Sequence, residues 1–291
     1  MTLLDLNAVR AGWRAVIDHP GPVAFAALVY APVFAAQSVW SAEGAIGRPG
    51  AAPLAILAAL LGLCVFVVSL AAWGRLAFGR DAGSGLFGHR LGVDERRLGV
   101  VALLLLVLTF TVVGTAFMAL AFMIAALALI NVDPDAPAPE GRIDIFALLG
   151  PGETAVAVIV IAAFALGSLW FFLRLALAYP STLAQDRVQV LTAWPLSRGA
   201  RAARMLVSVL LVSAPGLAVL AGLNLVSASV IGAFPASAPS AVDDGAVSAS
   251  LAGFAVASFL HGAVKIALIG APSALVLCRI YDQVMAEETA A

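Results

Sequence analysis

Six long runs of apolar residues dominate the 291-residue sequence, and charged side chains are nearly absent from them. A helix needs about 20 apolar residues to cross the hydrocarbon core of a bilayer, which is about 30 Å thick. Each run is long enough to do so. The sequence therefore predicts an all-α polytopic membrane protein with six transmembrane helices, which we expect to form three hairpins. The predicted spans are residues 21–40, 53–74, 100–130, 153–173, 206–234 and 251–278.

The composition supports the membrane class. The chain is 63% hydrophobic and 11% charged, whereas a soluble domain carries about 25% charged residues. So few charges cannot cover the surface of a soluble enzyme, and a disordered chain would be rich in charge and poor in apolar residues. The net charge of -1 also argues against a nucleic-acid partner.

The arginines are distributed unevenly between the segments that flank the six runs. If the six runs cross the membrane, successive flanking segments lie on opposite sides of it. Only Arg48 and Arg142 fall in the segments of one side, and the other arginines fall in the segments of the other side, which we call the second set. Cytoplasmic segments carry an excess of basic residues, so the second set is predicted to be cytoplasmic. Both termini belong to this set and are therefore predicted to be cytoplasmic. Arginine almost completely replaces lysine, which indicates a GC-rich bacterial coding bias, so we expect a multi-pass protein of the bacterial inner membrane. The arginines of the second set are Arg10, Arg14, Arg75, Arg80, Arg90, Arg96, Arg97, Arg174, Arg187, Arg198, Arg201, Arg204 and Arg279.

The residues before the first run alternate at helical spacing. Leu6 and Trp13 fall on one face, and Asn7 falls on another. This pattern predicts an amphipathic helix that lies in the cytoplasmic membrane interface; a soluble helix docked on the bundle is the alternative. The chain is thus divided into an interfacial helix, residues 1–19, and a six-helix transmembrane domain, residues 20–291.

Two segments carry a family resemblance. Residues 174–204 read RLALAYPSTLAQDRVQVLTAWPLSRGARAAR, and residues 8–21 read AVRAGWRAVIDHPG. The first segment places a proline and a short amphipathic helix after a membrane helix, and AWPLSRG before the next span. It resembles six-helix bacterial membrane proteins and is similar to the membrane domain that precedes some glycerophosphodiester phosphodiesterases. The resemblance implies a membrane-embedded helical domain without phosphodiesterase activity, since that chemistry needs a separate soluble barrel with metal ligands.

Lys265 is the only lysine and lies near the middle of the sixth run. A charge at the bilayer centre costs at least about 2.5–3.5 kcal/mol, so such residues usually face the bundle interior or a wet cavity. His261 lies one helical turn away on the same face, Ser258 continues that side, and Asn224 of the fifth run is a polar partner. These four residues form a candidate intramembrane polar site that lines a cavity or binds an anionic group. A lysine that is neutral in its apolar surroundings is one alternative. A structural lysine that is bonded to carbonyl groups or snorkels along the bundle is the other.

Two further groups of residues are candidate contact surfaces. Small residues let helix backbones approach closely in lipid, so those opposite Lys265 form a candidate packing face, within the chain or between copies. This face comprises Ala263, Ala267, Gly270 and Ala271. Arginines at helix ends attract anionic lipid headgroups by about 1 kcal/mol each. The candidate lipid contacts are Arg75, Arg96, Arg97, Arg198, Arg201 and Arg204.

The sequence contains no recognisable catalytic constellation. Residues 83–88 match the G-x-G-x-x-G pattern, but they follow a membrane helix rather than a strand, so we predict a flexible loop. We expect no catalytic residue, metal or cofactor. The sequence favours a non-enzymatic membrane accessory, scaffold or lipid-interacting domain, with the bilayer, a membrane protein or a second copy as partner. A small transporter that uses Lys265 and His261 is the alternative, and a membrane-embedded enzyme comes third.

Overall fold

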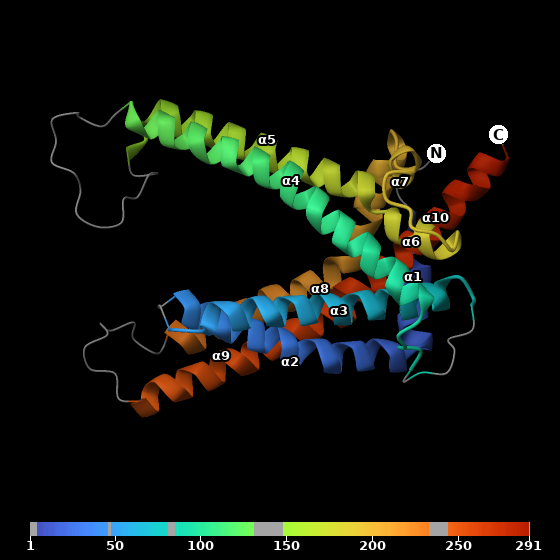
Figure 1. Ribbon diagram of the computed structural model, residues 1–291, viewed down its shortest axis with the longest axis horizontal. Helices are drawn as coiled ribbons and strands as arrows, with labels where there is room; N and C mark the ends of the chain where they lie inside the picture. The colour runs from blue at the N-terminus through green and yellow to red at the C-terminus, as the bar shows by residue number, and fades with distance from the viewer. Residues whose placement is uncertain are drawn as a thin grey trace.

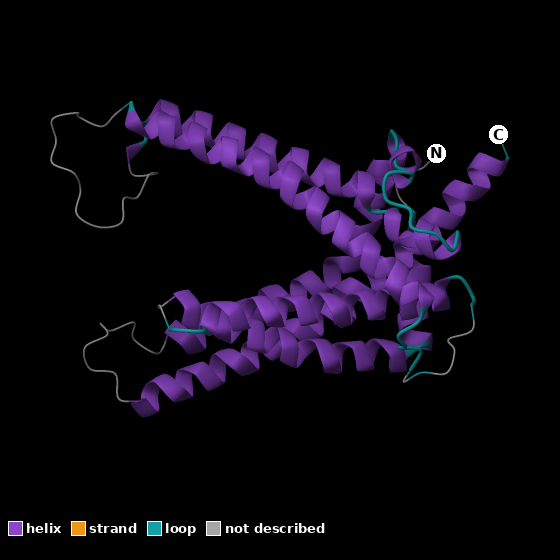
Figure 2. Ribbon diagram, viewed as in Figure 1, coloured by secondary structure: helices purple, strands orange, loops and turns teal. Residues whose placement is uncertain are grey.

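The computed structural model describes residues 5–45, 48–80, 85, 87–130, 148–232 and 244–290. In this part of the chain the regular secondary structure is helical, and no β-sheet forms (Figure 2). Six of its helical segments are long and apolar enough to cross a membrane. The prediction of an all-α protein with six candidate membrane spans is therefore confirmed.

The candidate spans coincide with the six apolar runs of the sequence. Most of them begin or end a few residues beyond the run, because polar and small residues continue the helix at its ends. The predicted end of the fifth span, residue 234, lies outside the described residues. The spans are α2 (Pro20–Ala45), α3 (Ala51–Ala77), α4 (Val93–Leu129), α5 (Pro151–Leu175), α8 (Ala200–Gly232) and a rod of α9 (Asp244–Val264), the π-helix η2 (Lys265–Gly270) and α10 (Ala271–Thr289).

The spans form two groups that meet at one end of the protein (Figure 1). In the first group α2 contacts both α3 and α9, and α8 contacts α9. In the second group α4 and α5 contact each other, and together they diverge from the first group (Figure 1). The first and last helices of the described chain both lie where the groups meet (Figure 1). We call this place the shared end; it also holds the helices α1 (Leu6–Asp18), α6 (Ala178–Ala184) and α7 (Ala193–Leu196).

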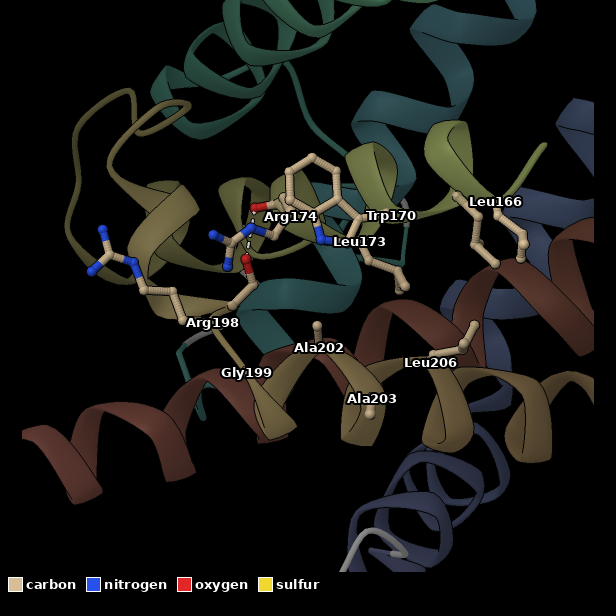
Figure 3. A pocket seen from close by; sticks show the side chains of 11 residues that line it. Leu166, Trp170, Leu173, Arg174, Arg198, Gly199, Ala202, Ala203 and Leu206 are labelled. Carbon is tan, nitrogen blue, oxygen red and sulfur yellow. Dashed lines mark hydrogen bonds between the residues drawn. The ribbon is translucent and has the colours of Figure 1, made fainter. Parts of the chain in front are cut away.

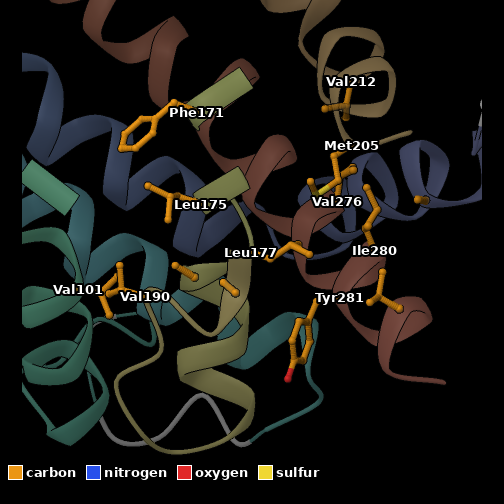
Figure 4. Close-up of a cluster of buried hydrophobic side chains, with 14 residues drawn as sticks. Val101, Phe171, Leu175, Leu177, Val190, Met205, Val212, Val276, Ile280 and Tyr281 are labelled. Atoms are coloured by element: carbon orange, nitrogen blue, oxygen red, sulfur yellow. The ribbon is translucent and has the colours of Figure 1, made fainter. Parts of the chain in front are cut away.

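The shared end contains a packed hydrophobic core (Figure 4). Leu177, Met205, Val276 and Ile280 are all completely buried there. The short helix α6 (Ala178–Ala184) lies inside this region, where α3, α4 and α10 surround it, and its residues 178–183 are buried. The helix expected after the fourth run is therefore present, but it is covered by protein rather than amphipathic.

The first described helix, α1 (Leu6–Asp18), packs against α10 and α8 at the shared end. The side chain of Asp5 caps it by accepting a hydrogen bond of 2.9 Å from the backbone N–H of Ala8. Gly12 permits the close approach, because a Cβ at this position would lie 2.7 Å from the Cγ2 of Val276. Ile17, on the other side of α1, is 70% exposed. Protein therefore covers one face of α1 and leaves another face open.

A buried ion-pair cluster ties α3 to the start of α4. The guanidinium of Arg75 lies 2.7 Å from Glu95 and 3.2 Å from Asp94, and it donates a hydrogen bond of 2.8 Å to the carbonyl of Gly88. The side chains of Arg75 and Glu95 are only 2% and 3% exposed. Glu95 also accepts a hydrogen bond from the backbone N–H of Gly92, which caps α4. These contacts anchor α4 to the first group of helices at the shared end.

Candidate functional site

A pocket of about 460 Å³ opens at the shared end between α5 and the beginning of α8 (Figure 3). Its wall combines leucines and Arg174 from the two helices with Arg198 and backbone from the connection that joins them. The pocket therefore has an apolar half and a cationic half. It is lined by Leu166, Leu169, Trp170, Leu173, Arg174, Ser197, Arg198, Gly199, Ala202, Ala203 and Leu206.

Arg174 packs against a pair of tryptophan rings that contact each other. Its guanidinium carbon lies 5.5 Å from the ring centroid of Trp170 and 5.1 Å from that of Trp194, distances at which a cation is attracted to the aromatic face. The two rings are themselves 5.4 Å apart and nearly perpendicular. This packing fixes the position of a cation whose neighbours are aromatic, so the charge of Arg174 is left for a ligand.

No carboxylate pairs with Arg174 among the described residues. The ion pairs of the described chain involve other arginines, and the Nε of Arg174 is buried without a hydrogen-bond partner. An unsatisfied buried polar group is costly, and in a native structure it calls for a physical explanation.

Local structure brings the second arginine to the same place. The hydroxyl of Ser197 donates a hydrogen bond of 3.0 Å to the carbonyl of Arg174, which holds the connection after α7 (Ala193–Leu196) against the end of α5. Gly199 has a φ of 58°, a left-handed conformation that glycine adopts without strain, and α8 begins directly after it. Arg198 is exposed at this turn, beside the positive end of the helix dipole of α8.

The apolar half of the pocket continues into the predicted membrane region. Leu166 and Leu169 of α5 are 67% and 41% exposed, and Leu206 of α8 faces them across the pocket. Figure 3 shows Arg174 and Arg198 toward one end of the pocket and Leu166 and Leu206 toward the other. The geometry suits an amphiphile with an anionic head and an apolar chain.

The arginines predicted to contact lipid divide into two groups. Arg75 is buried with Asp94 and Glu95, as described above, and three others also have carboxylate partners in the structure. Arg96 and Arg198 are exposed, and no ion pair is seen for either in the described part of the chain. The prediction that all six arginines contact lipid stays a prediction. The other pairs are Arg97 with Asp186 at 2.9 Å, Arg201 with Glu288 at 2.7 Å and Arg204 with Glu287 at 3.3 Å.

Asp186 joins two arginines outside the spans. The hydrogen bond from Arg80 is the main cause that lowers the pKa of its carboxyl below the ordinary value, and the charges of Arg80 and Arg97 add to the effect. Asp186 therefore stays charged in the folded protein at neutral pH. These arginines already have an anionic partner, which makes them poorer lipid contacts than Arg174 and Arg198.

The structure joins two members of the predicted polar site within the spans. The Nε2 of His261 lies 2.7 Å from the Oδ1 of Asn224, and its Nδ1 lies 2.8 Å from the carbonyl oxygen of Ala257. Lys265 lies one turn further along the rod, with its ammonium 4.2 Å from the ring centroid of Phe34 on α2.

The members of the predicted polar site differ in how exposed their side chains are. Ser258 is buried, whereas Asn224 and Lys265 are exposed. Lys265 lines none of the pockets described for this protein. The polar group thus lies on a surface of the helix bundle.

The predicted small-residue face contacts other helices of the same chain. Ala271 is completely buried and Ala267 packs in the same hydrophobic cluster, which includes residues of α2 and α3. Ala263 is half-buried. A Cβ at Gly270 would lie 3.7 Å from the ring of Phe66 on α3. Contact between copies through this face is not needed to explain these small residues.

The pocket contains an arginine that the sequence analysis did not select. Trp170 and Arg174 are one helical turn apart, which places them on the same face of α5, and this spacing is visible in the sequence. The position of Trp194 is not visible there, because it depends on how residues 176–199 fold back against α5. In the sequence, Arg174 is therefore distinguished from the other arginines only by its spacing from Trp170.

Comparison of the chain with protein-family models, curated proteins and solved structures finds no match. The resemblance to six-helix bacterial membrane proteins therefore stays a prediction. The geometry of the pocket and the pattern of the spans are the grounds on which a function can be argued.

Proposed function

We propose that this protein is a non-enzymatic membrane protein that binds an anionic phospholipid in the pocket between α5 and α8. The observation that carries the proposal is Arg174, a cation that packs against Trp170 and Trp194 without a carboxylate partner in the described chain. Arg198 supplies a second cation at the same end of the pocket. A phosphodiester headgroup matches two guanidinium groups because each can donate more than one hydrogen bond to phosphate oxygens.

The shape of the pocket supports a lipid over a free phosphate. Apolar side chains form the rest of the wall, and the exposed surfaces of Leu166 and Leu169 extend it along α5. An acyl chain would lie against these leucines while the headgroup stays at the helix ends. The volume of the pocket, about 460 Å³, lies within the range of small-molecule sites, about 300–1,000 Å³. It is large enough for a headgroup and the start of an acyl chain.

Lipids with brominated acyl chains test this proposal, because bromine quenches the fluorescence of a nearby tryptophan. In mixed vesicles, brominated phosphatidylglycerol should quench Trp170 and Trp194 at lower mole fraction than brominated phosphatidylcholine. Two arginines that contribute about 1 kcal/mol each predict a preference of about tenfold or more. The double variant Arg174→Gln with Arg198→Gln should reduce this preference to nearly none.

The control removes two exposed arginines that lie outside the pocket. Arg10→Gln with Arg96→Gln lowers the charge at the shared end by the same amount and should keep most of the preference. Equal quenching by the two lipids, or equal loss in both double variants, would show that only general surface charge attracts the lipid. Competition by inorganic phosphate without quenching would favour a free anion as the ligand.

We further infer the orientation of the protein from its arginines. The shared end is cytoplasmic in this proposal, the spans form three hairpins in a bacterial inner membrane, and the open face of α1 lies in the cytoplasmic interface. The inference is supported by the concentration of arginines in segments at the shared end, including the connections before α4 and before α8. It also puts the pocket on the leaflet side where basic residues meet anionic headgroups.

Cysteine labelling tests this orientation. In a chain with Cys64→Ala, a cysteine at Arg48, in the connection between α2 and α3, should react with an impermeant thiol reagent added to spheroplasts. A cysteine at Leu91, which is 91% exposed before α4, should react only after the membrane is permeabilised. The reverse pattern would invert the orientation, and labelling of both sites in sealed cells would contradict the span assignment.

Transport through Lys265 and His261 is the second function that the sequence allows. The contact between His261 and Asn224 shows that polar groups of two spans meet. However, Lys265 is exposed and lines none of the described pockets. This placement favours an outward-facing role for Lys265 over a path through the bundle.

A further inference from the structure

Lys265 presents an uncompensated charge on the outside of the helix bundle, at mid-depth of a span. It is exposed, and its contact is the ring of Phe34. About 14 residues separate it from each end of the sixth apolar run, which corresponds to about 20 Å of helix. A lysine side chain is too short to bring its ammonium to either interface from that depth, so snorkelling does not relieve its cost.

The apolar middle of each span contains no acid that could neutralise Lys265. No Asp or Glu occurs in the sixth run or in residues 20–40, 53–77, 98–130, 154–175 and 200–232. The acids at the shared end lie more than a dozen residues along the rod, at Asp282 and beyond. The ring of Phe34 attracts the ammonium, but a cation–π contact contributes only about 0.5–2 kcal/mol.

Other polar groups extend this outward surface. His261 lies one turn from Lys265 on the same rod, and it contacts the exposed Asn224 of α8. Exposed apolar side chains border the group, among them Leu260 on α9 and Leu225 on α8, which are 44% and 74% exposed. The arrangement combines an apolar rim with a polar centre. In a membrane, such a centre is stable only when another polar group covers it.

The π-helix begins at Lys265. Residues 265–270 form η2, in which the chain turns with one extra residue before the ordinary helix resumes at Ala271. Such π-helical turns are rare, and they occur frequently at functional sites. Gly216 of α8 packs directly on η2, because a Cβ there would lie 2.8 Å from the carbonyl oxygen of Leu268. The neighbouring helix therefore accommodates the unusual backbone that begins at Lys265.

We propose that the surface formed by Lys265, His261 and Asn224 docks a transmembrane helix of a different protein, and that this helix carries an Asp or Glu at mid-depth. Charge complementarity selects this occupant. A lipid phosphate stays at the interface and cannot reach the bilayer centre. A second copy of this chain has no carboxylate at mid-depth of its spans and would place one Lys265 near another. A carboxylate on a partner helix neutralises Lys265 and leaves the apolar rims of the two helices to pack.

The test uses a synthetic transmembrane helix as the probe, in vesicles of phosphatidylcholine at pH 8. The probe is a leucine- and alanine-rich helix with a fluorescent acceptor and one central Glu, and matched probes carry Gln or Leu instead. The donor is attached to a cysteine at Leu260, an exposed position next to His261 in the sequence, in the full-length protein with Cys64→Ala. Energy transfer to the Glu probe should occur at about tenfold lower probe concentration than transfer to the Gln probe.

Substitutions of Lys265 complete the test. Lys265→Met should reduce binding of the Glu probe to the level of the Gln probe, and Lys265→Arg should keep the difference. A donor at Val158, an exposed position on α5, should show no preference for the Glu probe and serves as the control. Equal transfer to the Glu and Gln probes, or unchanged binding by folded Lys265→Met, would overturn the proposal. Energy transfer between two labelled copies of the protein, if it is lost in Lys265→Met, would overturn the proposal in favour of self-association.

Discussion

Replacing Arg75 with methionine is expected to lower the free energy of unfolding by about 3–5 kcal/mol, because the change leaves a buried charge without its partner. Glu95 is 3% exposed and lies 2.7 Å from the Arg75 guanidinium. Without Arg75, the carboxylate of Glu95 would have to be protonated or move toward water. Either response weakens the anchor between α3 and α4, so unfolding in detergent should begin at the shared end.

A second substitution separates the lost charge from the lost packing. Glu95→Gln in the Arg75→Met background removes the stranded carboxylate, so the double variant should recover part of the stability. Arg80→Met is the control, since Arg80 is 35% exposed and its pair with Asp186 should contribute only about 0–1 kcal/mol. Denaturant unfolding followed by circular dichroism measures the free energy of unfolding of Arg75→Met, of the double variant and of Arg80→Met. Equal losses for Arg75→Met and Arg80→Met would show that the buried cluster does not stabilise the fold.

Gly216→Ala should also destabilise the protein, although alanine is the better helix former. A Cβ at residue 216 would lie 2.6 Å from the Cγ1 of Ile269, and 2.8 Å from the carbonyl oxygen of Leu268. A backbone carbonyl cannot rotate away as a side chain can, so α8 and η2 must separate. Overpacking of this kind costs about 1–3 kcal/mol.

Gly222 provides a matched control on the same helix. A Cβ there would meet nothing within 4 Å, so Gly222→Ala should leave stability unchanged or raise it by up to about 1 kcal/mol. Thermal melting of the two variants in the same detergent compares them directly. A melting temperature that rises in both variants would contradict the close contact between α8 and η2.

The six candidate spans could be predicted from the sequence because length and apolar composition suffice for a bilayer. A helix in lipid satisfies its own backbone hydrogen bonds, so each run forms a helix whatever surrounds it. The lateral arrangement could not be predicted in this way. Lipid tails are as apolar as leucine, and hydrophobicity therefore does not distinguish a side chain that faces lipid from one that faces another helix. The divergence of α4 and α5 from the other spans is such a feature.

The candidate sites depend on contacts between residues far apart in the sequence. Arg75 and Arg198 look alike in the sequence, since each flanks the end of an apolar run. The structure gives Arg75 two carboxylates and leaves Arg198 exposed in a pocket. Lys265 was identified because a charge within an apolar run is rare and costly. Its exposure could not be predicted, because that depends on how α2, α8 and α9 pack.

The divergence of α4 and α5 has a mechanical consequence. This pair of helices contacts the rest of the protein at the shared end and separates from it along its length (Figure 1). Protein contacts therefore hold the pair at the shared end, and in a bilayer lipid rather than protein would support the rest of its length.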